Sequence, residues 1–253
     1  MEINFGGFVP LSTVDWRGRA VCTLFLRGCP VRCHYCHNID LQSGKDMRGS
    51  DDIIDMIRKS RLMISGVIFS GGEPTMQKEA LLLLAKACRD LGLKVGVQTN
   101  GVFPDTLKAL IDAGLLDMVH LDIKTRWEHY PQLLKVRPGV IDKVKESLAI
   151  CRDANQDGRL EGFEVVVTLF RGREDDIPII AKYVEGIEFV LQQGVEGSIP
   201  PLSFDELKKI ADKINRRVRI RTREDGEVTY ENNRIIIADS IVLTDIMQAR
   251  RNE

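Results

Sequence analysis

The chain alternates between short apolar runs and longer segments in which apolar residues recur at helical spacing. The short runs are rich in valine, isoleucine, leucine and phenylalanine and end at turn-forming or charged residues, which is typical of buried β-strands. We expect strands over residues 20–27, 66–70, 94–99, 117–124, 163–170 and 187–193.

The longer segments between these runs have the pattern of amphipathic helices. Segment 76–92 ends at Gly92, a residue suited to the end of a helix. Segment 51–60 begins with two aspartates, where the helix dipole favours negative charge. We expect helices over residues 51–60, 76–92, 104–114, 138–154 and 174–184.

Regular alternation of strand and helix predicts parallel strands joined by helical crossovers. The six steps favour a barrel or partial barrel over an open sheet. We therefore predict an α/β fold, a partial parallel (β/α)6 barrel, over residues 1–195.

The alternation changes after residue 195. Residues 203–217 have helical spacing, and residues 218–239 are typical of strands joined by turns at Asp225-Gly226 and Asn232-Asn233. We expect residues 196–253 to form a small C-terminal extension.

Composition and charge exclude several functions. The 253 residues are 43% hydrophobic and 29% charged with a formal net charge of −1, so no global basic field favours nucleic acid. No apolar run is long enough to span a bilayer, and the first residues lack the pattern of a signal peptide. We expect a cytoplasmic protein without membrane partners, in which cysteines stay reduced.

Three of the six cysteines, Cys29, Cys33 and Cys36, lie in the loop after the first predicted strand. Thiolates so close in sequence can bind one soft metal centre. A [4Fe–4S] cluster held by three cysteines would keep one iron open. Alternatively, His34 or His37 would complete a structural zinc site. The other cysteines, Cys22, Cys88 and Cys151, are expected to be buried apolar residues.

A second motif, Ser70-Gly71-Gly72-Glu73-Pro74, follows the second predicted strand. Loops at the carboxyl ends of barrel strands build active sites, and glycines let the backbone approach a ligand closely. A tight turn without further function is the alternative reading of this motif alone. Its position downstream of a cysteine loop favours a binding site.

The two motifs together resemble the radical S-adenosylmethionine superfamily: C-x3-C-x2-C with Tyr35 before the last cysteine, then Gly-Gly-Glu-Pro. Residues 20–193 are compatible with the partial barrel of that superfamily. The run from Gly6 to Asn38, VQTNG (97–101) and HLDIK (120–124) resemble the glycyl-radical-enzyme activases. Among these, the run is most similar to the activating protein of anaerobic ribonucleoside-triphosphate reductase.

The resemblance implies an enzyme with a [4Fe–4S] cluster and S-adenosylmethionine as cofactors. Such an enzyme reductively cleaves S-adenosylmethionine to a 5′-deoxyadenosyl radical, which installs a glycyl radical on a partner enzyme. The implied partner is anaerobic ribonucleotide reductase, and the implied electron donor is a flavodoxin or ferredoxin. The resemblance makes Cys29, Cys33 and Cys36 the cluster ligands and the catalytic centre.

The resemblance also implies residues that bind the cofactor, in addition to the cluster ligands. His34, His37 and Asn38 would tune or shield the cluster without ligating it. Asp122 and Lys124 point to one face of a strand, where an opposed ion pair is expected. The implied cofactor-binding residues are Tyr35, Gly71, Gly72, Glu73, Thr99, Asn100, Asp122 and Lys124.

The chain departs from the family pattern in two respects. The extension 196–253 is not explained by the shared core, and no second cysteine cluster lies between Cys36 and Gly71, so one cluster is expected. Two alternatives stay open: an activase of another glycyl-radical enzyme, of the pyruvate formate-lyase type, and a non-catalytic zinc-binding interaction module.

Overall fold

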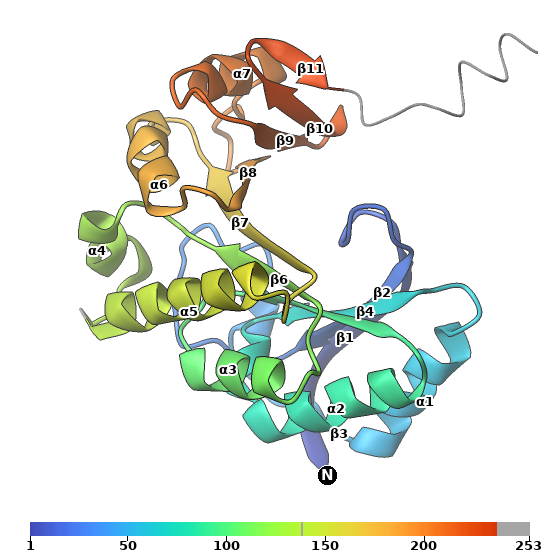
Figure 1. Cartoon of the computed structure of the whole chain (residues 1–253). Helices are drawn as coiled ribbons and strands as arrows, with labels where there is room; N and C mark the ends of the chain where they lie inside the picture. Colours follow the sequence, from blue (N-terminus) through green and yellow to red (C-terminus); the bar gives the residue numbers. More distant parts are fainter. Residues whose placement is uncertain (138, 237–253) are drawn as a thin grey trace, which may run out of the picture. The chain divides into compact units, whose positions relative to one another are not determined.

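The computed structural model describes residues 1–137 and 139–236 (Figure 1). It divides the chain into two compact units, of which unit 1 is Met1–Val166 and unit 2 begins at Val167. The predicted domain boundary at residue 195 stays a prediction. Pro138, at the expected start of a helix, and 237–239, at the end of the expected strands, lie outside the described residues.

Unit 1 is built on a parallel sheet with an antiparallel edge. Four parallel strands and the first residues of a fifth lie in sequence order, which confirms the predicted parallel α/β arrangement. They are β2 (Val21–Leu26), β4 (Gly66–Gly71), β5 (Lys94–Thr99), β6 (Met118–Asp122) and β7 (Gly162–Leu169), of which β7 continues into unit 2 after Val166. β1 (Glu2–Ser12) pairs antiparallel with β2, and β3 (Met47–Gly49) pairs antiparallel with β1.

Helices connect the parallel strands of unit 1 (Figure 1). The predicted helices appear as α1 (Ser50–Ser60), α2 (Lys78–Asp90), α3 (Pro104–Asp112) and α5 (Gly139–Gln156). A short helix, α4 (Tyr130–Leu134), and three 3-10 turns, Ile39–Leu41, Pro74–Met76 and Trp127–His129, complete the unit. Helix α2 begins later than predicted because Pro74–Met76 forms a 3-10 turn.

Each face of this sheet carries its own set of apolar side chains. Leu24, Phe69 and Val97 are fully buried on one face. Because side chains alternate along a strand, their neighbours in sequence point to the opposite face and form a second set. In that second set, Val21, Ile68 and Met118 pack with Trp16 near the amino ends of the strands; all four are buried. Cys22, Cys88 and Cys151 are fully buried, as predicted.

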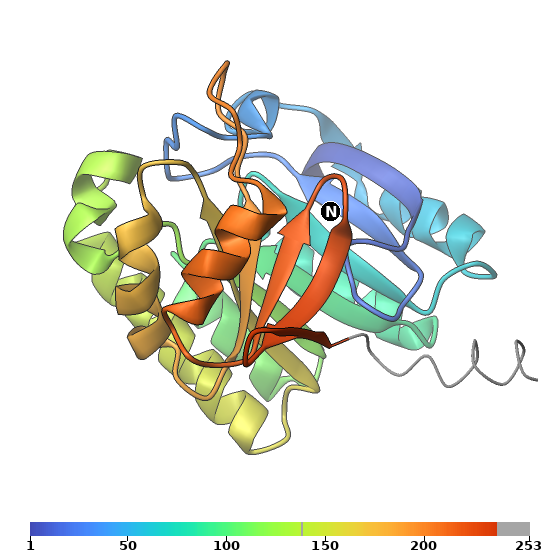
Figure 2. The same ribbon diagram turned by 90° about the horizontal axis from the view of Figure 1, so that it is seen from above.

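Unit 2 contains strands and helices at the predicted places. β8 (Glu188–Gln193) is parallel to β9 (Val218–Thr222), while β10 (Gly226–Glu231) pairs antiparallel with β9 and β11 (Arg234–Ile236) with β10. Its helices are α6 (Ile177–Tyr183), which a 3-10 turn at Glu174–Asp176 precedes, and α7 (Phe204–Asp212), which contacts β9 and β10 (Figure 2).

The sequence was less informative about some boundaries. The predicted helix 203–217 is wrong in extent: it ends at Asp212, and Asn215 has a φ of 45°, which a continuing helix does not allow. Strand β1 was not predicted because Gly6-Gly7 interrupts its alternating pattern. In the part of the chain that the structure describes, no helix has both the length and the apolar character needed to cross a bilayer.

Candidate functional site

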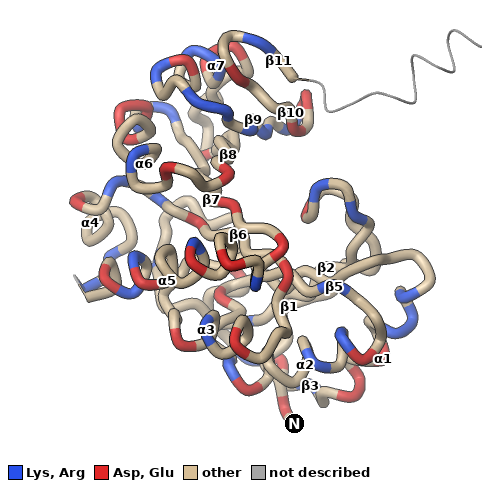
Figure 3. Tube along the Cα trace, viewed as in Figure 1, with Lys and Arg blue, Asp and Glu red and all other residues tan. Residues whose placement is uncertain are grey.

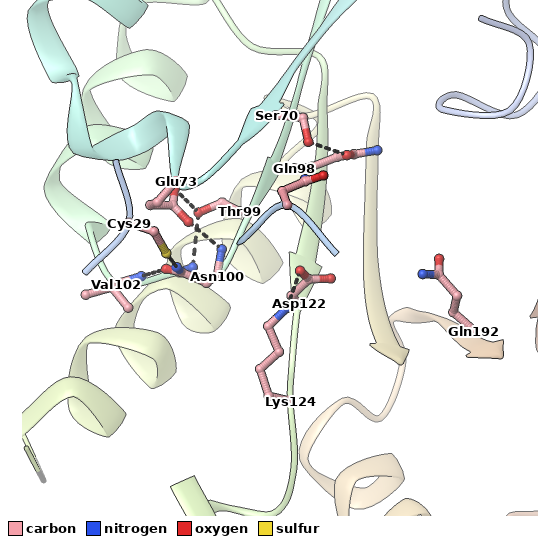
Figure 4. Close-up of polar contacts among 12 residues, drawn as sticks. Cys29, Ser70, Glu73, Gln98, Thr99, Asn100, Val102, Asp122, Lys124 and Gln192 are labelled. Carbon is pink, nitrogen blue, oxygen red and sulfur yellow. Dashed lines mark hydrogen bonds and ion pairs between the residues drawn. The ribbon is translucent and has the colours of Figure 1, made fainter. Parts of the chain in front are cut away.

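The candidate site lies along the carboxyl ends of neighbouring strands in unit 1. The cysteine loop follows β2, the Gly71-Gly72-Glu73 turn ends β4, Thr99 ends β5 and Asp122 ends β6. Because these strands are parallel neighbours, the four chain segments meet at one rim of the sheet. Figure 4 shows the polar side chains of this rim and the contacts among them.

The glycine pair allows the cysteine loop to pack directly on the turn after β4. The backbone N–H of Gly72 donates to Leu26 O at 2.9 Å, and that of Glu73 donates to Gly28 O at 2.7 Å. A Cβ on Gly72 would lie 2.3 Å from Gly28 O. Gly71 has a φ of +122°, a conformation that few other residues adopt. The two motifs found in the sequence are therefore in contact.

Glu73 joins the ends of β4 and β5. Its side chain is buried, and its Oε1 accepts from the backbone N–H and hydroxyl of Thr75 and from Thr99 Oγ1 at 2.7 Å. Its Oε2 accepts from the backbone N–H of Asn100 at 2.7 Å. Burial raises the pKa of Glu73, and these hydrogen bonds act against the rise.

The Glu73 side chain therefore positions Thr75, Thr99 and the backbone of Asn100. Its expected contact with S-adenosylmethionine stays a prediction, as do those of Gly71 and Gly72. Thr99 is also engaged, because its Oγ1 accepts from the backbone N–H of Gly101 at 3.0 Å while it donates to Glu73.

Asn100 connects this rim to the cysteine loop. Its Nδ2 donates to Cys29 Sγ at 3.6 Å, and its Oδ1 accepts from the backbone N–H of Val102 at 3.1 Å (Figure 4). The residue is 8% exposed. The structure therefore brings Asn100 to a predicted cluster ligand.

Asp122 and Lys124 form the expected ion pair, with Lys124 Nζ 2.6 Å from Asp122 Oδ2. Burial alone would lower the pKa of Lys124, but attraction to Asp122, Tyr35 and Cys33 outweighs it and the pKa is raised. The backbone N–H of Lys124 donates to the Tyr130 hydroxyl at 3.0 Å. The ammonium group is therefore held in its charged form beside the cysteine loop, and its predicted contact with the cofactor carboxylate stays a prediction.

The three cysteines lie on one loop, where Cys33 interacts electrostatically with both Cys29 and Cys36. Desolvation by burial raises the pKa of Cys29 to about 11 and also raises that of Cys33, and like charge on neighbouring sulfurs adds to both shifts. Among the described residues, no three His, Cys, Asp or Glu side chains are grouped to hold a metal ion.

The donor set of this loop nevertheless suits an iron–sulfur cluster. It offers three soft thiols on one loop, and Asn100 directs an N–H at the first of them. The loop also has local supports: Asn38 Nδ2 donates to Gly71 O at 3.2 Å, and the ring of His34 stacks edge-on with Tyr35 at 5.0 Å between centroids. His34 and His37 are exposed.

Two polar pairs on the same sheet face as Asp122 had no role in the sequence analysis. His120 Nδ1 lies 2.5 Å from Glu164 Oε1, and both side chains are buried. Ser70 Oγ donates to Gln98 Oε1 at 2.8 Å. The signal that could have found His120 was its spacing of two from Asp122, which places both on one face of the strand.

The comparisons with known proteins agree with this geometry. The profile of the Radical SAM superfamily matches residues 23–184. The chain belongs to the radical SAM superfamily. It is also 31% identical over 245 residues to a Methanocaldococcus jannaschii protein whose name assigns it to the glycyl-radical enzyme activating enzymes, covering 88% of this chain and 97% of that protein. This radical SAM protein is therefore a member of that group of enzymes.

Among the relatives found by sequence, some match only about half of this chain. The chain is 34% identical over 125 residues to the pyruvate formate-lyase 1-activating enzyme of Escherichia coli, covering 46% of this chain and 50% of the relative. The solved structure of TYW1 with a lysine–pyruvate adduct has a TM-score of 0.62 at 15% identity, covering 84% of this chain and 80% of that one.

Streptococcus suis SuiB bound to S-adenosylmethionine has a TM-score of 0.55 at 17% identity, covering 77% of this chain and 42% of SuiB. At these identities the likeness to solved structures concerns the fold. Family membership gives this enzyme its cofactors, a [4Fe–4S] cluster and S-adenosylmethionine.

Proposed function

We propose that this enzyme installs a glycyl radical on anaerobic ribonucleoside-triphosphate reductase. The observation that carries the proposal is the direct packing of the cysteine loop on the Gly-Gly-Glu turn, through Glu73 N–H to Gly28 O and Asn100 Nδ2 to Cys29 Sγ. This packing places the start of the cysteine loop against a rim of polar groups at the carboxyl ends of the strands, which supports a shared site.

The chain's own residues would bind and orient the cluster and S-adenosylmethionine. Cys29, Cys33 and Cys36 would hold the cluster, and Lys124, charged and paired with Asp122, would meet the carboxylate of S-adenosylmethionine. When bound, the cluster and S-adenosylmethionine supply the electron and the cleavable sulfonium bond of radical SAM chemistry. Tyr35, Gly71, Gly72, Thr99 and Asn100 would bind the remaining parts of the cofactor.

The choice of partner rests on sequence resemblance. The segment from Gly6 to Asn38 resembles the activating protein of anaerobic ribonucleotide reductase. A second candidate, pyruvate formate-lyase, is favoured by relatives named as activating enzymes of that protein. A flavodoxin or ferredoxin as electron donor, and a cytoplasmic location, complete the proposal. Membership in an enzyme family does not support the alternative of a zinc-binding interaction module.

The test is an anaerobic assay with reconstituted enzyme, S-adenosylmethionine and each purified candidate partner. We expect 5′-deoxyadenosine by mass spectrometry and a glycyl-radical signal by electron paramagnetic resonance (EPR), the latter with the reductase only. Cys33→Ala should lose both, whereas Cys151→Ala, a buried cysteine in α5, should keep both. A radical only on pyruvate formate-lyase would transfer the proposal to that partner, and a colourless zinc protein without product would refute it.

A further inference from the structure

The Asn100 amide is directed at the sulfur of the first predicted cluster ligand. Its Nδ2 lies 3.6 Å from Cys29 Sγ, within hydrogen-bond range for sulfur (Figure 4). We propose that Asn100 tunes the reduction potential of the [4Fe–4S] cluster through Cys29. The inference rests on the proposed function, because it requires the cluster that the function uses, and it gives Asn100 a role beyond the predicted contact with S-adenosylmethionine.

The orientation of the Asn100 amide follows from the hydrogen bond that its oxygen accepts. Asn100 Oδ1 accepts a hydrogen bond from the backbone N–H of Val102 at 3.1 Å, and an N–H can only donate. The amide nitrogen must therefore be the end that faces Cys29. A cysteine thiolate has no proton and can only accept, so the pair is matched in donor and acceptor.

The donor is also fixed in place. The backbone N–H of Asn100 donates to Glu73 Oε2 at 2.7 Å, and the next residue, Gly101, accepts through its carbonyl from Ser147 Oγ at 2.7 Å. Asn100 is buried, and a hydrogen bond in a place of low dielectric is stronger than one in water. The amide therefore needs no rearrangement to donate to the sulfur.

The effect on the cluster has a definite sign. A hydrogen bond to a ligating sulfur draws negative charge from the cluster and stabilises the reduced state, which carries one more electron. Removing the donor should therefore lower the reduction potential and make the cluster harder to reduce. Asn155 offers a matched control, because its Nδ2 donates to the backbone carbonyl of Leu160 at 3.1 Å and not to a sulfur.

The experiment is an EPR-monitored redox titration at pH 8 of reconstituted full-length enzyme without S-adenosylmethionine. For Asn100→Ala we expect the ratio of reduced to oxidised cluster at a fixed potential to fall about tenfold, which is about 59 mV for one electron. Asn100→Asp keeps an acceptor for Val102 N–H and replaces the donor by a negative charge, so its potential should fall further. Asn155→Ala should titrate like the unaltered enzyme.

A midpoint potential in Asn100→Ala equal to that of the unaltered enzyme, at full iron and sulfide content, would overturn the inference. If Asn100→Ala does not assemble its cluster, Asn100→Asp decides, and an unchanged or raised midpoint there refutes the role. Failure of the proposed function is distinguishable, because the unaltered enzyme would then contain no [4Fe–4S] cluster or would form no 5′-deoxyadenosine with one.

Discussion

The cysteine loop and the rim around Glu73 lie in contact, yet they are held in different ways. Both oxygens of the buried Glu73 carboxylate accept hydrogen bonds from within the chain, from Thr75, Thr99 and Asn100. The cysteine loop is fixed where it starts, through Gly28, whereas Cys29 and Cys36 are only half-buried and the three sulfurs are not grouped as a metal site among the described residues.

The difference separates two kinds of motif. The cysteines offer ligand atoms directly, so their spacing alone points to a metal centre, although it leaves zinc and an iron–sulfur cluster both open. The Gly-Gly-Glu turn contributes geometry: its glycines allow close packing, and its carboxylate fixes the backbone of Thr99 and Asn100. A side chain that belongs to a family motif can therefore also hold the backbone around the site, as the Glu73 carboxylate does.

The strongest way to break the contact between the two regions is Gly72→Ala. The added Cβ would meet Gly28 O at 2.3 Å and two further backbone atoms within 3.0 Å, and backbone cannot move aside as a side chain can. We expect a loss of about 3 kcal/mol in unfolding free energy, at the upper end for overpacking, together with low iron content. Urea denaturation and iron analysis would measure both.

Gly139→Ala is the matched control for this substitution. Gly139 is the first residue of α5, and a Cβ there would meet nothing within 4 Å. Alanine should therefore leave stability unchanged or raise it by about 0.5 kcal/mol. Equal stability of Gly72→Ala and the unaltered protein would contradict the close packing described for the turn.

A smaller effect is expected from Glu73→Gln, which keeps the shape and removes one acceptor oxygen. At least one buried donor among Thr75, Thr99 and Asn100 would lose its partner, which costs about 2 kcal/mol. Chemical denaturation would measure the change. Glu79→Gln, at an exposed position in the first turn of α2, should change stability by less than about 0.5 kcal/mol. Equal effects of the two substitutions would show that Glu73 does not hold the rim.

The smallest expected effect is on the pH dependence of stability. It contrasts Glu73 with Glu227, a carboxylate that has charged partners. Glu227 on β10 accepts from Arg219 at 2.8 Å and from Arg221 at 2.7 Å, on strands that carry both signs of charge (Figure 3). Burial alone would raise the pKa of Glu227, but the two guanidinium groups outweigh it and lower the pKa below the usual 4.5.

The Glu227 carboxylate therefore contributes stability above about pH 4.5, and this contribution is lost as the pH falls through its lower folded-state pKa. Unfolding free energies of Glu227→Gln and the unaltered protein should differ most near neutral pH and converge in acid. Glu73, whose pKa is raised, should not show this loss of stabilisation in acid. A constant difference between pH 7 and pH 3 would contradict the assignment for Glu227.

Much of the fold could be predicted because each element depends on local pattern. The apolar runs became β2 and β4–β8, and Asn232-Asn233 formed the predicted turn with φ of 49° and 61°. The pairing of His120 with Glu164 could not be predicted, because it depends on the register between β6 and β7, which one sequence does not contain. The inward turn of the Glu73 carboxylate likewise depends on β5 lying beside β4.

The packing of Trp16 against one face of the sheet has a consequence for tryptophan fluorescence. The chain has two tryptophans: Trp16 lies with Ile68 and Met118 near the amino ends of the strands, and Trp127 lies 5.2 Å from the Tyr130 ring, whose hydroxyl contacts Lys124. One fluorophore is therefore placed to report whether the sheet is intact, and the other to report events at the carboxyl rim. Each single substitution leaves one tryptophan. Emission from the Trp127→Phe variant should therefore follow folding through Trp16, and emission from the Trp16→Phe variant should follow cofactor binding through Trp127.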